Sequence, residues 1–252
     1  MIKHELYPKA VSAVELKHNL DEIHHRINQA CARAGRNPNS VRLLPVSKTV
    51  DEQHIRMAFS LGCHQFGENK VQEAMWKAEA MQDLAAEWSI IGHLQTNKIK
   101  YIARFASEFQ ALDSLNVAQE LHTRLEQENR TLDVFVQINT SGESSKYGLH
   151  PDQADDFIHN IAHLKRLKVR GLMTLALLSD ESDKVRNCFI LLRNIRNRLR
   201  DNLPEGMRMD ELSMGMSGDF EMAIEEGASI VRIGQAIFGA RALPDSYYWP
   251  EE

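Results

Sequence analysis

The sequence predicts an α/β protein in which eight parallel strands, each followed by a helix, close into a single (β/α)8 (TIM) barrel. Short apolar runs of strand character alternate with segments whose apolar residues recur at helical spacing, and this alternation requires a parallel sheet. Eight repeats within about 200 residues match the closed barrel, while an open, doubly wound sheet is the alternative. Because no linker or low-complexity stretch interrupts the pattern, we expect one domain over residues 1–252.

An additional helix precedes the first strand. Five apolar residues recur there at spacings of three or four and therefore share one helix face: Leu16, Leu20, Ile23, Ile27 and Cys31. Gly35 and Pro38 end this pattern. The sequence thus predicts an N-terminal helix over about residues 12–35, followed by the barrel over about residues 41–241.

Strand character takes the form of short runs rich in β-branched and aromatic residues that end at turn residues. The run at 134–138 is the clearest, whereas the first run contains Pro45, which removes one hydrogen bond from a ladder. The eight predicted strands lie at 41–46, 64–66, 88–91, 109–112, 134–138, 169–173, 211–214 and 230–233.

Helical periodicity follows each of these strands. Thr49 and Glu52 have the spacing of a capping box, which predicts the start of the helix after the first strand. Pro151 suits the first turn of a later helix. The predicted helices run up to residue 61 and then over 69–84, 97–105, 117–128, 151–164, 183–203 and 221–226, with a final turn at 236–238.

Composition narrows the class of protein. Hydrophobic residues make up 43% of the chain and charged residues 26%, as in ordinary globular proteins, and the net charge of −5 argues against binding to nucleic acid or an anionic membrane. No apolar run reaches the roughly 18 residues of a membrane span, and no signal peptide is recognisable. Cys31, Cys63 and Cys188 lack metal-ligand spacing and indicate thiols in a reducing compartment, so we expect a cytoplasmic protein without a metal.

Polar and glycine residues gather where the predicted strands end, and barrels of this class bind their ligands at that rim. Lys48 directly follows the apolar first strand, so its stem is expected to point into the barrel mouth. Partial removal from water lowers the pKa of a lysine, and the neutral amine can attack an aldehyde. The alternative is a lysine at the strand end whose ammonium group reaches solvent.

The loops after the seventh and eighth strands predict a phosphate site. Ser217 lies between Gly215 and Gly218 ahead of a predicted helix, and Gly234 and Gln235 precede the final turn. Backbone N–H groups of such loops and of a helix start bind phosphate at this end of many barrels, although the glycines could serve only as tight turns. A reactive lysine beside a phosphate site indicates a phosphorylated aldehyde, of which pyridoxal 5'-phosphate (PLP) is the commonest cofactor.

Arg232 lies inside the eighth predicted strand. If its side chain faces the barrel interior, it would leave a pyridine nitrogen of the cofactor unprotonated, since arginine itself does not give up a proton. The alternative places Arg232 on the outer face, where it would pair with a carboxylate of a helix. The alternation of side chains along a strand favours the interior, because Val231 and Ile233 then face the helices.

Two further features of the sequence each have two possible interpretations. The arginines at positions 193, 196, 198 and 200 of the long predicted helix form either a solvated face or a site for an anionic partner. The loop at 144–148, which contains Tyr147, is either a lid over the barrel mouth or an ordinary surface turn.

Seven short blocks occur in the order found in one known family. They are VSKT at 46–49, FGEN at 66–69, IGHLQTNK at 91–98, SKYG at 145–148, GLM at 171–173, SMGMS at 213–217 and VRIG at 231–234. With these blocks, the sequence closely resembles the pyridoxal phosphate homeostasis proteins, also called the YggS-like or proline synthetase co-transcribed (PROSC) family. The resemblance covers about residues 10 to 241 and is highly specific, because seven blocks share one order.

This resemblance implies a barrel like the N-terminal domain of alanine racemase, which is the type III fold of PLP proteins, without the C-terminal β domain of the racemases. It implies that PLP is bound as a Schiff base on Lys48. By the same resemblance, Arg232 would face the pyridine nitrogen, and Asn69 and Met214 would line the ring.

The resemblance also assigns the phosphate of PLP to three residues near the end of the barrel. These are Ser217, Gly234 and Gln235. Many members of the family have threonine at the position of Gln235, so a hydroxyl contact is lost in this chain, while the backbone N–H remains able to bind phosphate.

The implied function is intracellular PLP homeostasis, in which the protein carries PLP and has no efficient catalytic activity. PLP-dependent apo-enzymes are candidate partners, and whether PLP is delivered to them stays open. The resemblance also favours a monomer, because the racemase dimer domain is missing. The first alternative is a weak PLP-dependent amino-acid racemase, with Lys48 as one base and His93 or Tyr147 as the other. The second is a class I aldolase with a Schiff-base lysine and a site for a sugar phosphate.

Overall fold

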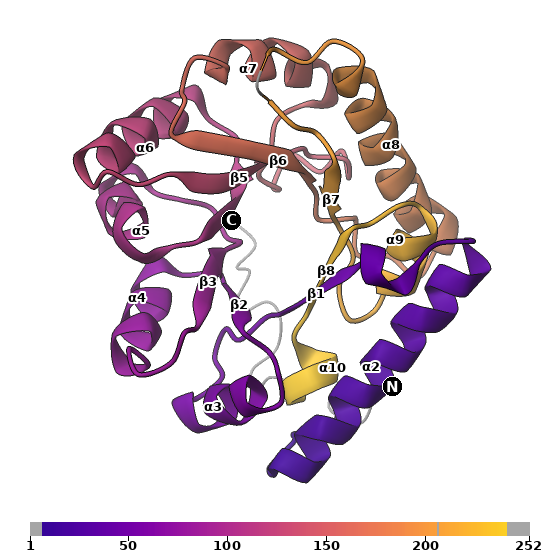
Figure 1. Cartoon of the computed structure of the whole chain (residues 1–252). Helices are drawn as coiled ribbons and strands as arrows, with labels where there is room; N and C mark the ends of the chain where they lie inside the picture. Colours follow the sequence, from indigo (N-terminus) through magenta and orange to yellow (C-terminus); the bar gives the residue numbers. More distant parts are fainter. Residues whose placement is uncertain (1–6, 206, 241–252) are drawn as a thin grey trace.

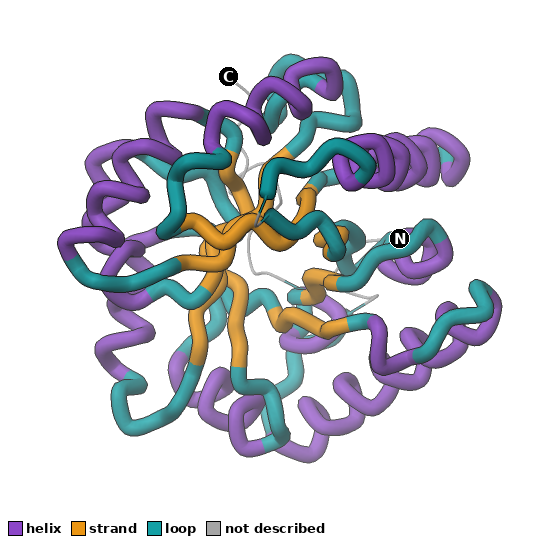
Figure 2. The backbone as a smooth tube through the Cα atoms, turned by 45° about the horizontal axis from the view of Figure 1, so that its top comes forward, coloured by secondary structure: helices purple, strands orange, loops and turns teal. Residues whose placement is uncertain are grey.

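The protein forms a barrel of eight parallel strands surrounded by helices (Figures 1 and 2). The computed structural model describes residues 7–205 and 207–240. The strands are β1 (Arg42–Pro45), β2 (Gln65–Glu68), β3 (Glu87–Ile90), β4 (Glu108–Leu112), β5 (Leu132–Gln137), β6 (Leu167–Met173), β7 (Glu211–Ser213) and β8 (Ile230–Ile233). In the sheet, β1 pairs with β8, and the order then runs through β7, β6, β5, β4 and β3 to β2.

The barrel closes between β1 and β2, just beyond the end of β1. Val46 and Gly67 form a parallel bridge there, and the N–H of Ser47 donates to the carbonyl oxygen of Gly67 at 3.0 Å. The predicted (β/α)8 barrel is therefore confirmed. The open, doubly wound alternative is wrong, because the first and last strands of such a sheet would not pair with each other.

Helices cover the outer surface of the barrel, and every connection from one strand to the next passes through a helix (Figure 1). They are α2 (Ala13–Arg33), α3 (Glu52–Ser60), α4 (Val71–Ala80), α5 (Ile99–Phe105), α6 (Leu115–Gln127), α7 (Ala154–Ile161), α8 (Ser182–Arg200), α9 (Phe220–Glu225) and α10 (Gln235–Phe238), with 3₁₀ turns at Pro38–Ser40, Thr96–Lys98 and Pro151–Gln153. Pro151 therefore begins a 3₁₀ turn that leads into α7, not a continuous α-helix.

The predicted capping box after the first strand is wrong. Asp51 is the N-cap of α3, and its carboxylate accepts the N–H of His54 at 3.0 Å. Thr49 instead belongs to a tight turn, in which it has a φ of 64° and the N–H of Val50 donates to the carbonyl oxygen of Ser47 at 2.9 Å. The spacing of Thr49 and Glu52 was misleading because Thr49 belongs to the turn after β1, and the helix starts only after Asp51.

The additional N-terminal helix, α2, packs against the last two repeats of the barrel (Figure 1). The five residues predicted to share one face are all buried. The side-chain amide of Asn19 donates to the carbonyl oxygen of Ile237 at 2.9 Å, and Arg26 pairs with Glu221 at 3.0 Å. Helix α2 therefore supports α9 and α10, which follow β7 and β8.

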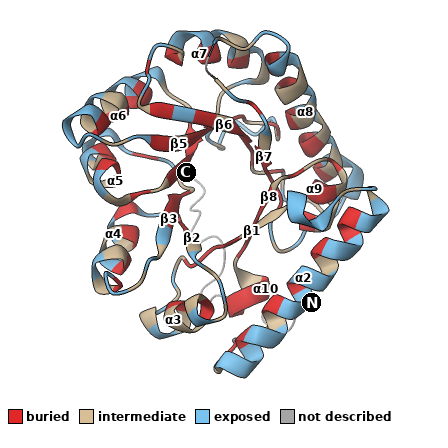
Figure 3. Ribbon diagram, in the orientation of Figure 1, coloured by how far each residue is buried: buried red, intermediate tan, exposed pale blue. Residues whose placement is uncertain are grey.

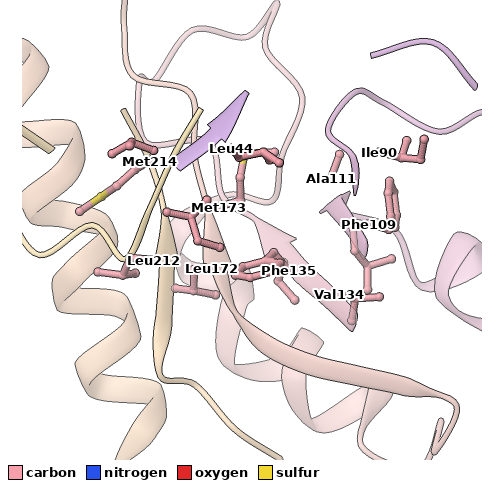
Figure 4. Packing of buried hydrophobic residues seen from close by; sticks show 14 of the residues in the cluster. Leu44, Ile90, Phe109, Ala111, Val134, Phe135, Leu172, Met173, Leu212 and Met214 are labelled. Carbon is pink, nitrogen blue, oxygen red and sulfur yellow. The ribbon is translucent and has the colours of Figure 1, made fainter. Parts of the chain in front are cut away.

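The two faces of the sheet have different environments. Apolar side chains fill the layer between strands and helices, as the buried faces in Figure 3 and the packing in Figure 4 show. The interior of the barrel contains polar side chains as well, and the hydroxyl of Ser213 on β7 donates to Gln110 Oε1 on β4 at 2.6 Å. Because β5 and β6 separate these two strands in the sheet, this hydrogen bond crosses the interior.

Residues 7–205 and 207–240 carry neither a membrane-spanning helix nor a cluster of metal ligands. No helix in this part of the chain is long and apolar enough to cross a bilayer. The same residues contain no group of three or more His, Cys, Asp or Glu side chains placed to hold a metal ion. Cys31, Cys63 and Cys188 are free, and burial raises the pKa of the Cys63 thiol to about 11, so this thiol is unreactive at neutral pH.

Candidate functional site

Lys48 lies at the C-terminal end of β1, where the chain leaves the barrel wall. The residue before it, Ser47, is fully buried, and its hydroxyl donates to Glu68 Oε1 at 2.6 Å on the helix side of the sheet. Lys48 itself is a central residue of the tight turn that the N–H of Val50 closes with the carbonyl oxygen of Ser47, at the rim where the strands end. Lys48 is half-buried, so its side chain is partly removed from water.

Arg232 faces the interior of the barrel. Its side chain is only 3% exposed, and the guanidinium donates to the hydroxyl of Ser213 and to the carbonyl oxygen of Thr174, both at 2.7 Å. The alternative of an outer-face arginine is therefore wrong. Burial lowers the pKa of Arg232 to about 10, although the charges of Asp219 and Glu108 oppose this, so the guanidinium is charged at neutral pH.

A chain of hydrogen bonds continues from Arg232 across the interior. Because a serine hydroxyl has one proton, the hydroxyl of Ser213 accepts from Arg232 and donates to Gln110 Oε1. The amide of Gln110 then donates to Glu108 Oε1 at 2.6 Å. The other carboxylate oxygen of Glu108 accepts from Arg42 at 2.7 Å. These contacts hold Ser213, Gln110 and Glu108 in place between the two arginines, and they determine which group donates and which accepts in each hydrogen bond.

The predicted phosphate residues meet at one corner of the barrel mouth. The hydroxyl of Ser217 accepts the N–H of Ala236, in the first turn of α10, at 3.3 Å. Gly234 precedes this helix, and a Cβ on it would lie 3.0 Å from the carbonyl oxygen of Val46. The glycine thus allows the end of β8 to pass close to the segment that leads to Lys48. The structure brings Ser217, Gly234 and Gln235 together at the start of α10, a helix of four residues.

Asn69 and Met214 have different positions. Asn69 is half-buried at the end of β2, and a Cβ on Gly92 would lie 2.4 Å from its carbonyl oxygen, so only glycine fits in the neighbouring loop. Met214 is fully buried and follows Ser213, whose side chain faces the interior. By alternation, the Met214 side chain lies on the opposite face, with Leu212 (Figure 4). Contact between Met214 and a ligand in the mouth would therefore come from its main chain.

An aromatic pair spans the rim above β4. The rings of His93 and Tyr147 stack with centroids 3.9 Å apart and an interplanar angle of 9°. Beside them, Asp113 accepts the N–H of Gly148 at 3.1 Å, and burial raises the pKa of its carboxyl group while His93 opposes that rise. The loop at 144–148 is therefore fastened to the loop after β3 and to Asp113, although its residues are far from either in sequence.

Three of the four predicted arginines of α8 bind neighbouring elements, while Arg200 is exposed. Arg193 pairs with Glu226 at 2.5 Å, and Arg198 pairs with Asp155 at 2.6 Å. Arg196 donates to the carbonyl oxygen of Asp210 at 3.1 Å. These contacts tie α8 to the loop after α9, to α7 and to the segment before β7, which favours a structural role over a site for an anionic partner.

A buried charged cluster behind Lys48 was missed by the sequence analysis. It consists of Glu68 at the end of β2 and of Glu73 and Lys77 on α4, and the Lys77 side chain is 1% exposed. One signal in the sequence could have indicated it, because Lys77 shares a helix face with Val71 and Ala74. A lysine on an apolar helix face requires a buried partner.

Comparison with known families identifies the class of barrel and the family of the chain. Residues 18–242 match the family model described as alanine racemase, N-terminal domain, which defines the class of barrel. The chain belongs to the family of pyridoxal phosphate homeostasis proteins. It is 42% identical to the protein of that name from Aquifex aeolicus, over 88% of this chain and 96% of that protein, and 38% identical to the one from Haemophilus influenzae, over 90% and 97%.

Solved structures show the same similarity. A crystal structure of an unknown protein from Bifidobacterium adolescentis has a TM-score of 0.85 at 34% identity and covers 92% of this chain and 99% of that one. PipY from Synechococcus elongatus, solved with PLP bound, has a TM-score of 0.76 at 30% identity, over 85% and 100%. Alanine racemase from Streptomyces lavendulae has a TM-score of 0.70 at 16% identity, which shows the fold alone, and 59% of that chain is matched.

Proposed function

We propose that this protein binds PLP as a Schiff base on Lys48 and serves PLP homeostasis as a carrier, without efficient catalysis. One observation carries the proposal. Leu44 is in register with Arg232 in the pairing of β1 with β8, so the strand that leads to Lys48 lies beside the strand that holds the buried guanidinium. The names of the relatives and the PLP-bound structure of PipY support the choice of cofactor.

The donor groups at the barrel mouth fit PLP. This cofactor supplies an aldehyde for bonding to an amine, a pyridine ring and a phosphate. The amine of Lys48, once it has lost a proton to solvent, would bond to the aldehyde carbon with release of one water molecule. Arg232 would face the ring nitrogen without protonating it, because a guanidinium that is still charged at neutral pH is a poor proton donor.

The remaining predicted residues would hold the ring and the phosphate. The hydroxyl of Ser217 and the backbone N–H groups at Gly234 and Gln235 would bind the phosphate, and the start of α10 favours negative charge there. Asn69 and the main chain of Met214 would line the ring. In this arrangement Gln235 binds the phosphate through its backbone N–H, so its side chain is not needed for that contact.

A weak amino-acid racemase is a second candidate, and the stacked His93 and Tyr147 favour it. These rings, together with Asp113, place titratable groups at the rim, where a second base would have to act. Chiral chromatography of an amino-acid panel separates the two functions. Rapid racemisation that disappears in Lys48→Ala would exclude a carrier without catalysis, whereas turnover no faster than with free PLP would exclude the racemase.

Delivery to other enzymes is the remaining part of the proposal. We infer that the chain acts as one PLP-binding domain and as a monomer in the cytoplasm, where its free thiols would stay reduced. The loaded protein should restore activity to a PLP-dependent apo-enzyme. Sedimentation of the loaded and unloaded forms tests the monomer, and reactivation no faster than by an equal amount of free PLP would argue against directed delivery.

The decisive experiment maps the attachment site. PLP is added to the purified protein, the absorption spectrum is recorded, and the sample is reduced with borohydride and digested for peptide mass spectrometry. We expect a new absorption band and one phosphopyridoxyl adduct on Lys48, both absent in Lys48→Ala. A wild-type protein that stays colourless, or carries adducts scattered over surface lysines, would overturn the proposed attachment and would direct attention to the aldolase alternative.

A further inference from the structure

The short segment that carries Lys48 is held from behind by a charged cluster. We refer to Glu68, Glu73 and Lys77 as the α4 cluster. The Lys77 ammonium donates to Glu68 Oε1 at 2.8 Å, to Glu73 Oε1 at 2.7 Å and to the carbonyl oxygen of Ser47 at 2.7 Å. An ammonium group has three N–H donors, so every donor of Lys77 is used, and one of them binds the residue directly before Lys48.

The α4 cluster also holds the residue directly after Lys48. The N–H of Thr49 donates to Glu73 Oε1 at 2.6 Å, the same oxygen that accepts from Lys77. Thr49 has a φ of 64°, a left-handed conformation that is unfavourable for a β-branched residue. A hydrogen bond to a carboxylate is stronger than one to a neutral acceptor and helps to offset this cost.

The contacts on the two sides of Lys48 act together. Ser47 is bound through its hydroxyl by Glu68 and through its carbonyl oxygen by Lys77, while Thr49 is bound through its N–H by Glu73. All three contacts are made by groups of β2 and α4, on the helix side of the sheet. The main chain on both sides of Lys48 is therefore fixed without any group of the cluster entering the barrel mouth.

We propose that Lys77 and Glu73 are positioning residues for Lys48: they hold the strained turn at Ser47–Thr49 so that the lysine amine enters the barrel mouth at the place where an aldehyde is bound. This inference rests on the proposed attachment of PLP to Lys48. The simpler interpretation is an ion pair that joins α4 to β2 and adds only stability. The two interpretations predict different behaviour in variants that remain folded, because only the positioning role slows the modification of Lys48.

The test compares isosteric and truncating substitutions that all lie on helix α4. Glu73→Ala removes the acceptor for Thr49, Glu73→Gln keeps an oxygen acceptor without the charge, and Glu79→Ala is the matched control on the exposed face of α4. Lys77→Met removes the second anchor. Urea denaturation first establishes that each variant is folded, and because Glu73 is 24% exposed, its variants keep the test valid if Lys77→Met does not fold.

Two measurements then report on Lys48. The first is hydrogen–deuterium exchange of the peptide containing Thr49 in the cofactor-free protein. The second is the rate of adduct formation on Lys48 at limiting PLP, stopped with borohydride. For Glu73→Ala we expect Thr49 exchange to rise and Lys48 modification to fall by about tenfold or more each, as expected for losing a hydrogen bond to a charged group. Glu73→Gln should recover most of both, and Glu79→Ala should match the wild type.

The outcomes separate the inference from the function on which it rests. Folded Glu73→Ala and Lys77→Met variants that modify Lys48 at the wild-type rate would overturn the positioning role while leaving PLP attachment intact. A wild-type protein that forms no Lys48 adduct would overturn the proposed function, and the positioning role with it. Faster Thr49 exchange together with slower Lys48 modification, both restored in Glu73→Gln, supports the inference.

Discussion

The segments that carry Lys48 and Arg232 lie side by side at the barrel mouth, but they are supported in opposite ways. Behind Lys48, on the helix side of the sheet, the supports are the charged groups of the α4 cluster. Inside the barrel, the groups that bind Arg232 directly are neutral, the hydroxyl of Ser213 and the carbonyl oxygen of Thr174, and the carboxylate of Glu108 lies further along the chain, beyond Gln110. Neutral groups do not titrate, whereas a buried carboxyl group does, so the two sides should respond differently to pH.

The two sides differ in the pKa of their buried groups. Burial raises the pKa of Glu68 to about 7, although the charge of Lys77 opposes the rise. Within residues 7–205 and 207–240, Glu68 Oε2 has no hydrogen-bond partner, which adds to the cost of ionising this group. Arg232, whose pKa burial lowers to about 10, keeps its charge throughout the neutral range. We therefore expect the Lys48 side to respond to pH near neutrality through Glu68.

The largest effect is expected for Lys77→Met at pH 8. This substitution leaves the fully buried carboxyl group of Glu68 without its ammonium partner, so the group must either stay ionised unpaired or take up a proton, and the free energy of unfolding should fall by about 3–5 kcal/mol. Urea denaturation at pH 8 measures the loss. The double variant Glu68→Gln/Lys77→Met removes both charges and should recover more than half of the stability. Equal losses in the single and double variants would show that the packing of the lysine stem, not charge, supports α4.

The next effect is a fall in stability with rising pH. The carboxyl group of Glu68 binds a proton more tightly in the folded protein, with a pKa of about 7 against a reference value of 4.5. Between these pH values the folded state therefore binds more protons than the unfolded state, and the free energy of unfolding decreases as pH rises. A tenfold change in an ionisation constant corresponds to about 1.4 kcal/mol, so this group contributes a loss of up to about 3 kcal/mol.

Glu68→Gln isolates this contribution. The amide cannot ionise, so the variant should lose less stability than the wild type between pH 5 and pH 8, with the two curves diverging through the window from about 4.5 to 7. Denaturation series at constant ionic strength provide the comparison. Burial also raises the pKa of Asp113 and of Asp219, and these groups act equally in both proteins. Parallel curves would mean that Glu68 stays ionised beside Lys77.

The sequence predicted the parts of this site that depend on local order along the chain. Lys48 follows an apolar strand, and Ser217 and Gly234 precede helices, so a rule about strand ends in barrels was enough to select them. The alternation of side chains similarly favoured the interior for Arg232, which the hydrogen bonds to Ser213 and Thr174 confirm.

The supports could not be predicted in the same way, because they depend on contacts that the barrel creates. Glu73 and Lys77 have the spacing of an ordinary surface pair on a helix, and only the packing of α4 on β2 buries the lysine. Gln110 and Ser213 are 103 residues apart and meet across the interior from strands that are not neighbours. No periodicity within a strand specifies which polar side chain lies opposite another in a closed barrel.

The smallest of these effects, and the sharpest test of the contrast, is expected for Gln110→Leu on the Arg232 side. Leucine leaves the hydroxyl of Ser213 without its acceptor and removes one donor from Glu108. The loss should be about 1–3 kcal/mol, and it should differ less between pH 5.5 and pH 8 than the loss in Lys77→Met, because neither glutamine nor serine titrates and Glu108 keeps its ion pair with Arg42. Urea denaturation at both pH values measures it. Gln119→Leu, on the exposed face of α6, should change stability by less than about 0.5 kcal/mol. If the Gln110→Leu loss instead differs between the two pH values as strongly as the Lys77→Met loss, the chain below Arg232 responds to pH through Glu108, and both halves of the barrel mouth are pH-sensitive.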